Sequence, residues 1–234
     1  MKGVRTIALA CAIAGLATAT PAMAAITVSG SGNSTTVNIT SGTALGDNFT
    51  INFNGQVDGT PLAGVSSSLK MTFQGTSGNS YVFDYLLSNT SSVAGRVSVF
   101  GFDTDPNLVG ASIVSGFFDT ISAGSMENAN VEFCLDHGQT NNCNNSTQGV
   151  GVFAGSSVSG RFKLTFNGIP SSVTLSDFHD KYQSLAPDGK SALGIPVGAV
   201  PEPGTWALML LGFAGVGGAL RRSNRRDKVL MQIA

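Results

Sequence analysis

The sequence has little charge and few of the side chains that most enzymes use for catalysis. Only 12% of its 234 residues are charged, and it contains 2 histidines and 1 tryptophan. Between residues 25 and 200 the only glutamates are Glu127 and Glu132. No Gly-x-Ser-x-Gly nucleophile elbow lies between a strand and a helix. We therefore expect no enzymatic activity and no cofactor, although carboxylate pairs far apart in the sequence leave a secreted hydrolase open as an alternative.

Basic residues are scarce in the middle of the chain. Residues 25–200 carry six basic and twelve acidic side chains, so this part has a formal net charge near -6, against -1 for the whole chain. An acidic surface repels the phosphates of nucleic acid and of anionic lipid. We therefore expect no nucleic-acid partner.

The first 24 residues have the three parts of a secretory signal peptide. Lys2 and Arg5 form a basic start, an apolar run follows over residues 7–16, and Ala22-Met23-Ala24 matches a cleavage site. We expect signal peptidase to cut here, so that an exported chain begins at Ala25.

A helical pattern is also missing between residues 25 and 200. Apolar and polar residues instead alternate in about ten short stretches separated by Gly, Asn and Ser clusters, and Asp58-Gly59 predicts a tight turn. The stretches are 36–40, 48–54, 69–73, 81–85, 96–104, 113–119, 131–135, 150–154, 161–166 and 173–178. Val97 and Val99 are expected on one face of their strand, with Phe100 and Phe102 partly on the other. The pattern predicts an all-β, jelly-roll-like β-sandwich over residues 25–185.

Residues 186–200 are rich in glycine and proline. This composition is typical of a flexible segment. We expect them to form a linker between the sandwich and the C-terminal region.

The C-terminal region combines an extended start, a short apolar run and a basic end. Pro201 and Pro203 hold the peptide around Glu202 extended, and Trp206 suits a membrane boundary. The fifteen residues 206–220 reach roughly 22 Å as a helix, against a hydrocarbon core of about 30 Å. Arginines then mark the cytoplasmic side, with residues 227–234 as a cytoplasmic tail. The short transmembrane helix is either a recognised and removed signal or a plain tail anchor.

These elements in this order resemble the PEP-CTERM sorting signal of Gram-negative bacteria over residues 201–226. The resemblance implies recognition by an exosortase, a membrane-embedded transpeptidase-like enzyme, cutting near the Pro-Glu-Pro, and release to the cell surface. The residues that carry recognition and orientation are Pro201, Glu202, Pro203, Trp206, Arg221, Arg222, Arg225 and Arg226. We expect a non-enzymatic protein of the cell surface or of the extracellular polysaccharide matrix of a biofilm.

The body of the chain also resembles the cistern family of PEP-CTERM proteins. The matching stretches are 96–103, 131–134 with Cys143, 177–178 and 182–184. This resemblance implies a shared exported domain and no known activity.

The exported part keeps two cysteines, Cys134 and Cys143, because Cys11 lies in the signal peptide. An even pair in an oxidising compartment predicts a disulfide. It would close an Asn-rich loop that has few apolar residues to bury. The alternative is a metal site formed by the two cysteines with His137.

Asp103, Asp105 and Asn107 follow the spacing that begins a calcium loop. Leu108 and Val114 stand where an EF-hand has glycine and glutamate, so an exposed turn is the competing interpretation. A calcium-assisted carbohydrate-binding module is therefore kept as an alternative function, although the exported domain has no tryptophan to stack on a sugar.

Overall fold

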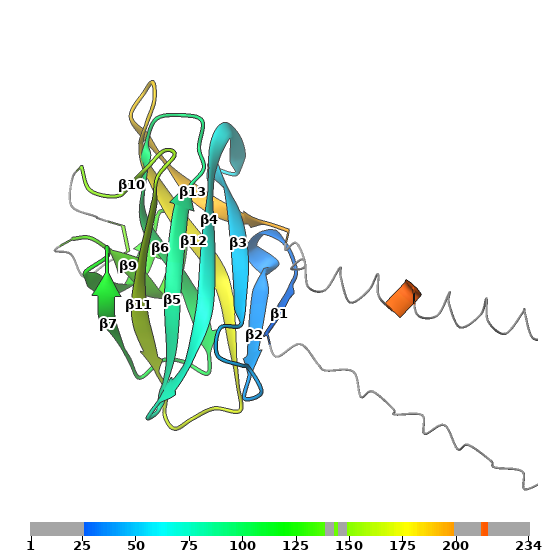
Figure 1. Cartoon of the computed structure of the whole chain (residues 1–234). Coiled ribbons are helices and arrows are strands. Elements are labelled where there is room, and N and C mark those ends of the chain that lie inside the picture. The colour runs from blue at the N-terminus through cyan, green and yellow to red at the C-terminus, as the bar shows by residue number, and fades with distance from the viewer. Residues whose placement is uncertain (1–25, 139–142, 145–148, 199–211, 215–234) are drawn as a thin grey trace, which may run out of the picture.

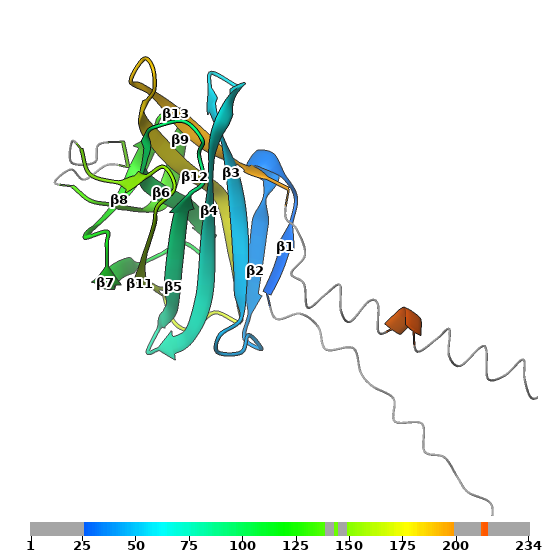
Figure 2. The same cartoon turned by 45° about the horizontal axis from the view of Figure 1, so that its top comes forward.

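The computed structural model describes residues 26–138, 143–144, 149–198 and 212–214. These residues form thirteen strands and one 3-10 turn, drawn in Figure 1 and Figure 2. The elements are β1 (Ile26–Ser29), η1 (Gly32–Ser34), β2 (Thr36–Thr40), β3 (Asn48–Val57), β4 (Thr60–Ser77), β5 (Ser80–Asn89), β6 (Arg96–Asp105), β7 (Gly110–Gly116), β8 (Thr120–Met126), β9 (Ala129–Asp136), β10 (Val152–Phe153), β11 (Ser157–Thr165), β12 (Ser172–Leu185) and β13 (Lys190–Val197). The all-β prediction is confirmed.

The strands belong to one continuous antiparallel sheet that folds into two facing layers. Its order is β7-β11-β5-β4-β3-β13-β12-β6-β9-β8, with β2 added beside β12, β1 beside β2 and β10 beside β6. Figure 1 shows β11, β5, β4 and β3 side by side in the front layer. The end strands β7 and β8 contact each other, so the two layers meet again at that side.

Aromatic rings from both layers fill the space between them. The Phe162 ring of β11 lies 5.0 Å from the Phe133 ring of β9, and Tyr85 of β5 lies 5.3 Å from Phe100 of β6. The alternation seen in the sequence supplies these rings because every second residue of a strand faces the same side. The expected sandwich core is therefore present, but hydrogen bonds connect its layers through β13.

The apolar residues of β6 are arranged differently from the sequence prediction. Val97 packs in the main core with Phe100 and Phe102, whereas Val99 belongs to a small second cluster. The reason is a register shift: Lys181 of β12 pairs with Val99 and the next residue, Tyr182, pairs with Val97. Ser98 is therefore the extra residue of a β-bulge, which reverses the alternation on either side of it.

The expected linker over residues 186–200 is wrong for most of its length. Lys190–Val197 form β13, which pairs with β12 on one side and with β3 on the other. Leu193, Ile195 and Val197 supply an apolar alternation that the glycine and proline content masked. Pro196 is tolerated because the pairing with β12 ends at Gly194, so that this part of β13 has a neighbour only on the β3 side.

Other strand limits also differ from the sequence prediction. β8 and β1 were not predicted, and β7 begins three residues earlier than the expected stretch 113–119. β8 has only small or polar residues between Ile121 and Met126, so its sequence has no strand-like alternation. The Asp58-Gly59 turn is confirmed, with φ of 47° and 79°.

A buried carboxyl lies in the main core beneath two glycines. Asp180 of β12 pairs with Gly194 of β13, and Gly194 pairs with Gly55 of β3. The missing side chain at Gly194 leaves room for the Asp180 carboxyl, which accepts a hydrogen bond from the Ser67 hydroxyl of β4, while Gly55 leaves room for Val65 and Tyr182. Asp180 is fully buried, and desolvation raises its pKa from 3.8 to about 7.

We predict that Gly194→Ala destabilises the fold by about 2 kcal/mol or more, because the new methyl group would overlap with the Asp180 carboxyl. Urea unfolding of the two proteins measures this change. Gly198→Ala is the matched control, since a Cβ there meets nothing within 4 Å. Equal stability of the two variants would contradict the packing described.

A second prediction concerns pH. The pKa of Asp180 is higher in the folded protein than in the unfolded chain, so the folded protein keeps this proton to a higher pH. The free energy of unfolding that this group contributes therefore falls as pH rises from about 4 to about 7. Asp180→Asn mimics the protonated acid and has no such loss. Its free energy of unfolding relative to the parent should therefore increase by on the order of 2 kcal/mol from pH 5 to pH 8.

Urea unfolding at both pH values measures this difference, with Asp105→Asn, an exposed carboxylate, as the control. A gain for Asp180→Asn that does not change with pH would show that the carboxyl is not protonated in the fold.

Candidate functional site

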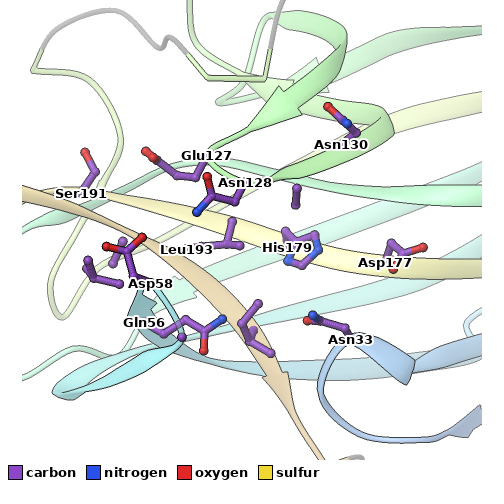
Figure 3. A pocket seen from close by; sticks show the side chains of 15 residues that line it. Asn33, Gln56, Asp58, Glu127, Asn128, Asn130, Asp177, His179, Ser191 and Leu193 are labelled. Atoms are coloured by element: carbon purple, nitrogen blue, oxygen red, sulfur yellow. The ribbon is translucent and has the colours of Figure 1, made fainter.

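A cleft of about 540 Å³ lies on the outer face of β12 and β13. Figure 3 shows its floor on β12 and β13 and its walls on the β3–β4 turn, the β8–β9 turn and η1. It opens on the side of the sheet opposite the aromatic core. Its lining residues are Asn33, Gln56, Val57, Asp58, Gly59, Glu127, Asn128, Ala129, Asn130, Asp177, His179, Ser191, Ala192, Leu193 and Ile195.

A second β-bulge, in β12, orients His179 toward the cleft. The pairing of β12 with β6 shifts between Ser176 and His179, and Asp177 there has a φ of 46°. Leu175 and Phe178 therefore both face the core, while His179 and Lys181 face outward. Without this bulge the alternation after Leu175 would place His179 inside the core.

His179 is only 4% exposed, yet its side chain lines the cleft. Its Nδ1 donates a hydrogen bond to the Gly194 carbonyl oxygen at 3.3 Å. Burial lowers the pKa of His179, so the ring is neutral and Nε2 carries a lone pair. Among the described residues Nε2 has no hydrogen-bond partner. Figure 3 shows the ring near the middle of the labelled side chains.

Three carboxylates line the cleft together with this imidazole, and all three sit at left-handed backbone positions. Asp58, Glu127 and Asp177 have φ of 47°, 53° and 46°. Turns and bulges force this conformation, which is uncommon for residues other than glycine and costs of the order of 1 kcal/mol each. The cleft is therefore built from two tight strand connections, at Asp58 and Glu127, and from the bulge of β12 at Asp177.

Lys181 fastens the β8–β9 turn onto β12. Its Nζ lies 2.8 Å from Glu127 Oε1 and donates to the backbone oxygen and Oδ1 of Asn144 at 2.7 and 2.6 Å. Asn144 Oδ1 also accepts from the Glu127 amide at 3.3 Å. Lys181 is 5% exposed, so these acceptors replace the lost hydration of its ammonium.

Asn144 is placed by the neighbouring disulfide. Cys134 and Cys143 are joined, with Cα atoms 5.9 Å apart, as the sequence predicts. Both sulfurs pack in the second cluster with Val99, Met126, Val131 and, at its edge, Leu193. His137 takes no part in a site with them, because its Nδ1 lies 3.3 Å from Asp119 Oδ2. The disulfide thus ties the wall of the cleft to β9.

The calcium candidates are spread along β6 and the turn after it. Asp103 Oδ1 accepts a hydrogen bond from the Glu132 amide at 2.6 Å, and both Asp105 and Asn107 are exposed. Glu132 instead holds the turn, because its carboxylate accepts from Thr104 and from the Leu108 amide at 2.7 Å. Within the described ranges no cluster of three or more His, Cys, Asp or Glu side chains suits a metal ion.

The predicted sorting residues lie outside the described part of the chain, as does the predicted signal peptide. Of the expected transmembrane segment only residues 212–214 are described, and these are helical. None of the helices in the described residues combines the length and hydropathy needed to cross a bilayer.

The cleft residues were not predicted as a site. His179 and the carboxylates Asp177 and Asp180 are close together in the sequence. In the structure Asp177 and His179 line the cleft, whereas Asp180 lies in the core. The bulge of β12 at Asp177, which is responsible, leaves no clear mark on the sequence.

The contacts predict a coupling between Lys181 and the disulfide. Cys134→Ser combined with Cys143→Ser should cost about 2.5–3 kcal/mol by loop closure. Lys181→Met should cost about 1–3 kcal/mol in the parent, because it leaves the half-buried acceptors of Glu127 and Asn144 without this donor. In the cysteine-free protein its cost should fall by about 1 kcal/mol, because Asn144 is then no longer held. Urea unfolding of the four proteins measures the coupling.

Lys190→Met supplies the control for that cycle, since Lys190 pairs with Asp188 in an exposed turn. Additive costs for Lys181→Met and the cysteine changes would contradict the link between the disulfide and the cleft wall.

Comparison with known proteins identifies one region of the chain. The family model described as the PEP-CTERM protein-sorting motif matches residues 199–226. No curated protein and no solved structure matches the chain. The match confirms the resemblance found at the C-terminal region, while the likeness to the cistern family stays a prediction. The chain therefore carries a PEP-CTERM sorting motif, which supports export and exosortase-dependent, membrane-anchored sorting before release.

Proposed function

We propose that this chain is a non-enzymatic protein of the cell surface or of the extracellular polysaccharide matrix, sorted by an exosortase. The observation that carries the proposal is the sorting motif at residues 199–226. Pro201, Glu202, Pro203 and Trp206 would be the residues recognised, and the arginines from Arg221 onward would set the orientation.

The exported domain is suited to conditions outside the cell. Its disulfide needs an oxidising compartment. Its charged residues are few, and the buried ammonium of Lys181 is satisfied by Glu127 and Asn144.

The position of β13 places the domain next to the site of processing. Gly198, Ala199 and Val200 alone separate Val197 from Pro201. Even fully extended, this step covers less than about 15 Å. The folded domain would therefore lie close to the membrane surface while its signal is still attached, and processing would release it whole.

The cleft on β12 and β13 favours a second candidate function, a carbohydrate-binding module. It is concave, it has the volume of an ordinary ligand site, and polar groups dominate the middle of it. Calcium assistance through Asp103, Asp105 and Asn107 gains no support, because Asp103 already accepts a hydrogen bond from the Glu132 amide.

The sorting proposal is tested by replacing Pro201, Glu202 and Pro203 with alanine in the producing cell. The parent protein should appear at the surface or in the medium without its C-terminal apolar run. The variant should stay in the membrane fraction at the higher mass, because the recognised peptide is gone. Intact mass of the membrane and medium fractions measures both.

Asp188→Ala, an exposed change in the β12–β13 turn, is the control and should be processed like the parent. Parent protein that keeps residues 207–220 wherever it is found would show a permanent tail anchor and overturn the proposal.

A further inference from the structure

We infer that the cleft on β12 and β13 binds a saccharide unit that bears an amine. The inference deepens the proposed association with extracellular polysaccharide, and it rests on that proposal for the choice of a saccharide over other amine-bearing molecules. The site itself is argued from the hydrogen-bonding groups, the charges and the shape of the cleft.

The first argument is an unused acceptor at the centre of the cleft. His179 is 4% exposed and is fixed by the hydrogen bond from Nδ1 to the Gly194 carbonyl oxygen. That bond makes Nδ1 the protonated nitrogen, so Nε2 can only accept. A buried imidazole with a fixed tautomer and a free lone pair is matched to a donor on a ligand, such as a hydroxyl or an ammonium.

The second argument is the sign of the charges around this acceptor. Asp58, Glu127 and Asp177 line the cleft, and none of its described lining residues is a lysine or an arginine. Lys181 neutralises Glu127 from below, which leaves Asp58 and Asp177 as the carboxylates available to a ligand. They attract a cation and repel a carboxylate or a phosphate.

The third argument is the remaining lining. Asn33, Gln56 and Asn128 add amide groups that donate and accept hydrogen bonds, which suits a ring that carries several hydroxyls. Among the described lining residues none has a phenyl, phenol or indole ring, so a sugar would be held by hydrogen bonds and charge and not by stacking. The volume of about 540 Å³ is in the range of sites for small ligands.

The fourth argument is that the cleft keeps its shape without a ligand. Its walls are fixed by the disulfide, by the contacts of Lys181 and by the short turns at Asp58 and Glu127. A site formed in advance loses less conformational entropy on binding.

The test uses the full chain, purified in detergent from a host without an exosortase. Titration calorimetry compares three probes: a glucosamine trisaccharide with free amines, the N-acetylglucosamine trisaccharide and a galacturonate trisaccharide. We expect the free-amine sugar to bind most tightly, the N-acetylated sugar more weakly, and the anionic sugar not at all. Because this chain is never sorted, failure of the sorting proposal does not affect the result.

Asp58→Asn combined with Asp177→Asn isolates the charge. Asparagine tolerates positive φ as well as aspartate does, so both turns should fold. The double variant should lose about tenfold in affinity for the free-amine sugar and change little for the N-acetylated one. Asp105→Asn removes an exposed carboxylate outside the cleft and should bind like the parent.

Imidazole ¹⁵N NMR gives an independent reading, because the chain contains only two histidines. Binding should shift the His179 Nε2 resonance and leave that of His137 in place. The inference is overturned if neither amine-derived sugar binds, if the galacturonate binds best, or if the double variant binds the free-amine sugar like the parent.

Discussion

The side-chain alternation of β12 is the constraint on which both faces of this protein depend. β12 is hydrogen-bonded to β13, β2 and β6, so each of its residues is held in a fixed orientation. The bulge at Asp177 lets Leu175 and Phe178 both enter the core, and it sends His179 and Lys181 outward. Without the bulge, the alternation after Leu175 would place His179 in the core and Phe178 outside it, and the cleft would be lost together with the packing.

Polar groups in the interior fasten parts of the chain that hydrophobic contacts alone would not place. Asp180 meets Ser67 of β4, which lies beyond β13 and β3 in the sheet, and Gly194 leaves the space for its carboxyl. On the outer face, Lys181 and the disulfide hold the β8–β9 turn and Asn144. Burying such groups costs desolvation, so their net contribution to stability is small. Their effect is to fix the relative positions of separate turns, which is what a rigid cleft requires.

Sequence patterns predicted the features that depend on neighbours in the chain. The alternations that contain Phe49, Phe83 and Phe162 became core strands, and the cysteine pair became a disulfide. The features that could not be predicted depend on pairing between distant segments. β13 was hidden because its glycine is explained only by Asp180 and Tyr182 on another strand. The bulges in β6 and β12, and therefore the cleft, result from the register with partner strands, which local alternation does not contain.

The sorting motif and the cleft are physically different features of this chain, and β13 joins them. Sorting depends on a contiguous motif at residues 199–226, which a processing enzyme can recognise in extended peptide. The cleft exists only after strands from both halves of the exported domain have paired. β13 supplies Leu193 and Ile195 to the cleft, completes the sheet between β12 and β3, and ends at Val197, directly before the motif. The last strand to be synthesised is thus needed for both layers to close. A chain whose sheet is incomplete leaves β13 and the residues before Pro201 unpaired, whereas a finished domain holds Val197 in the sheet and presents only the peptide beyond it to the enzyme.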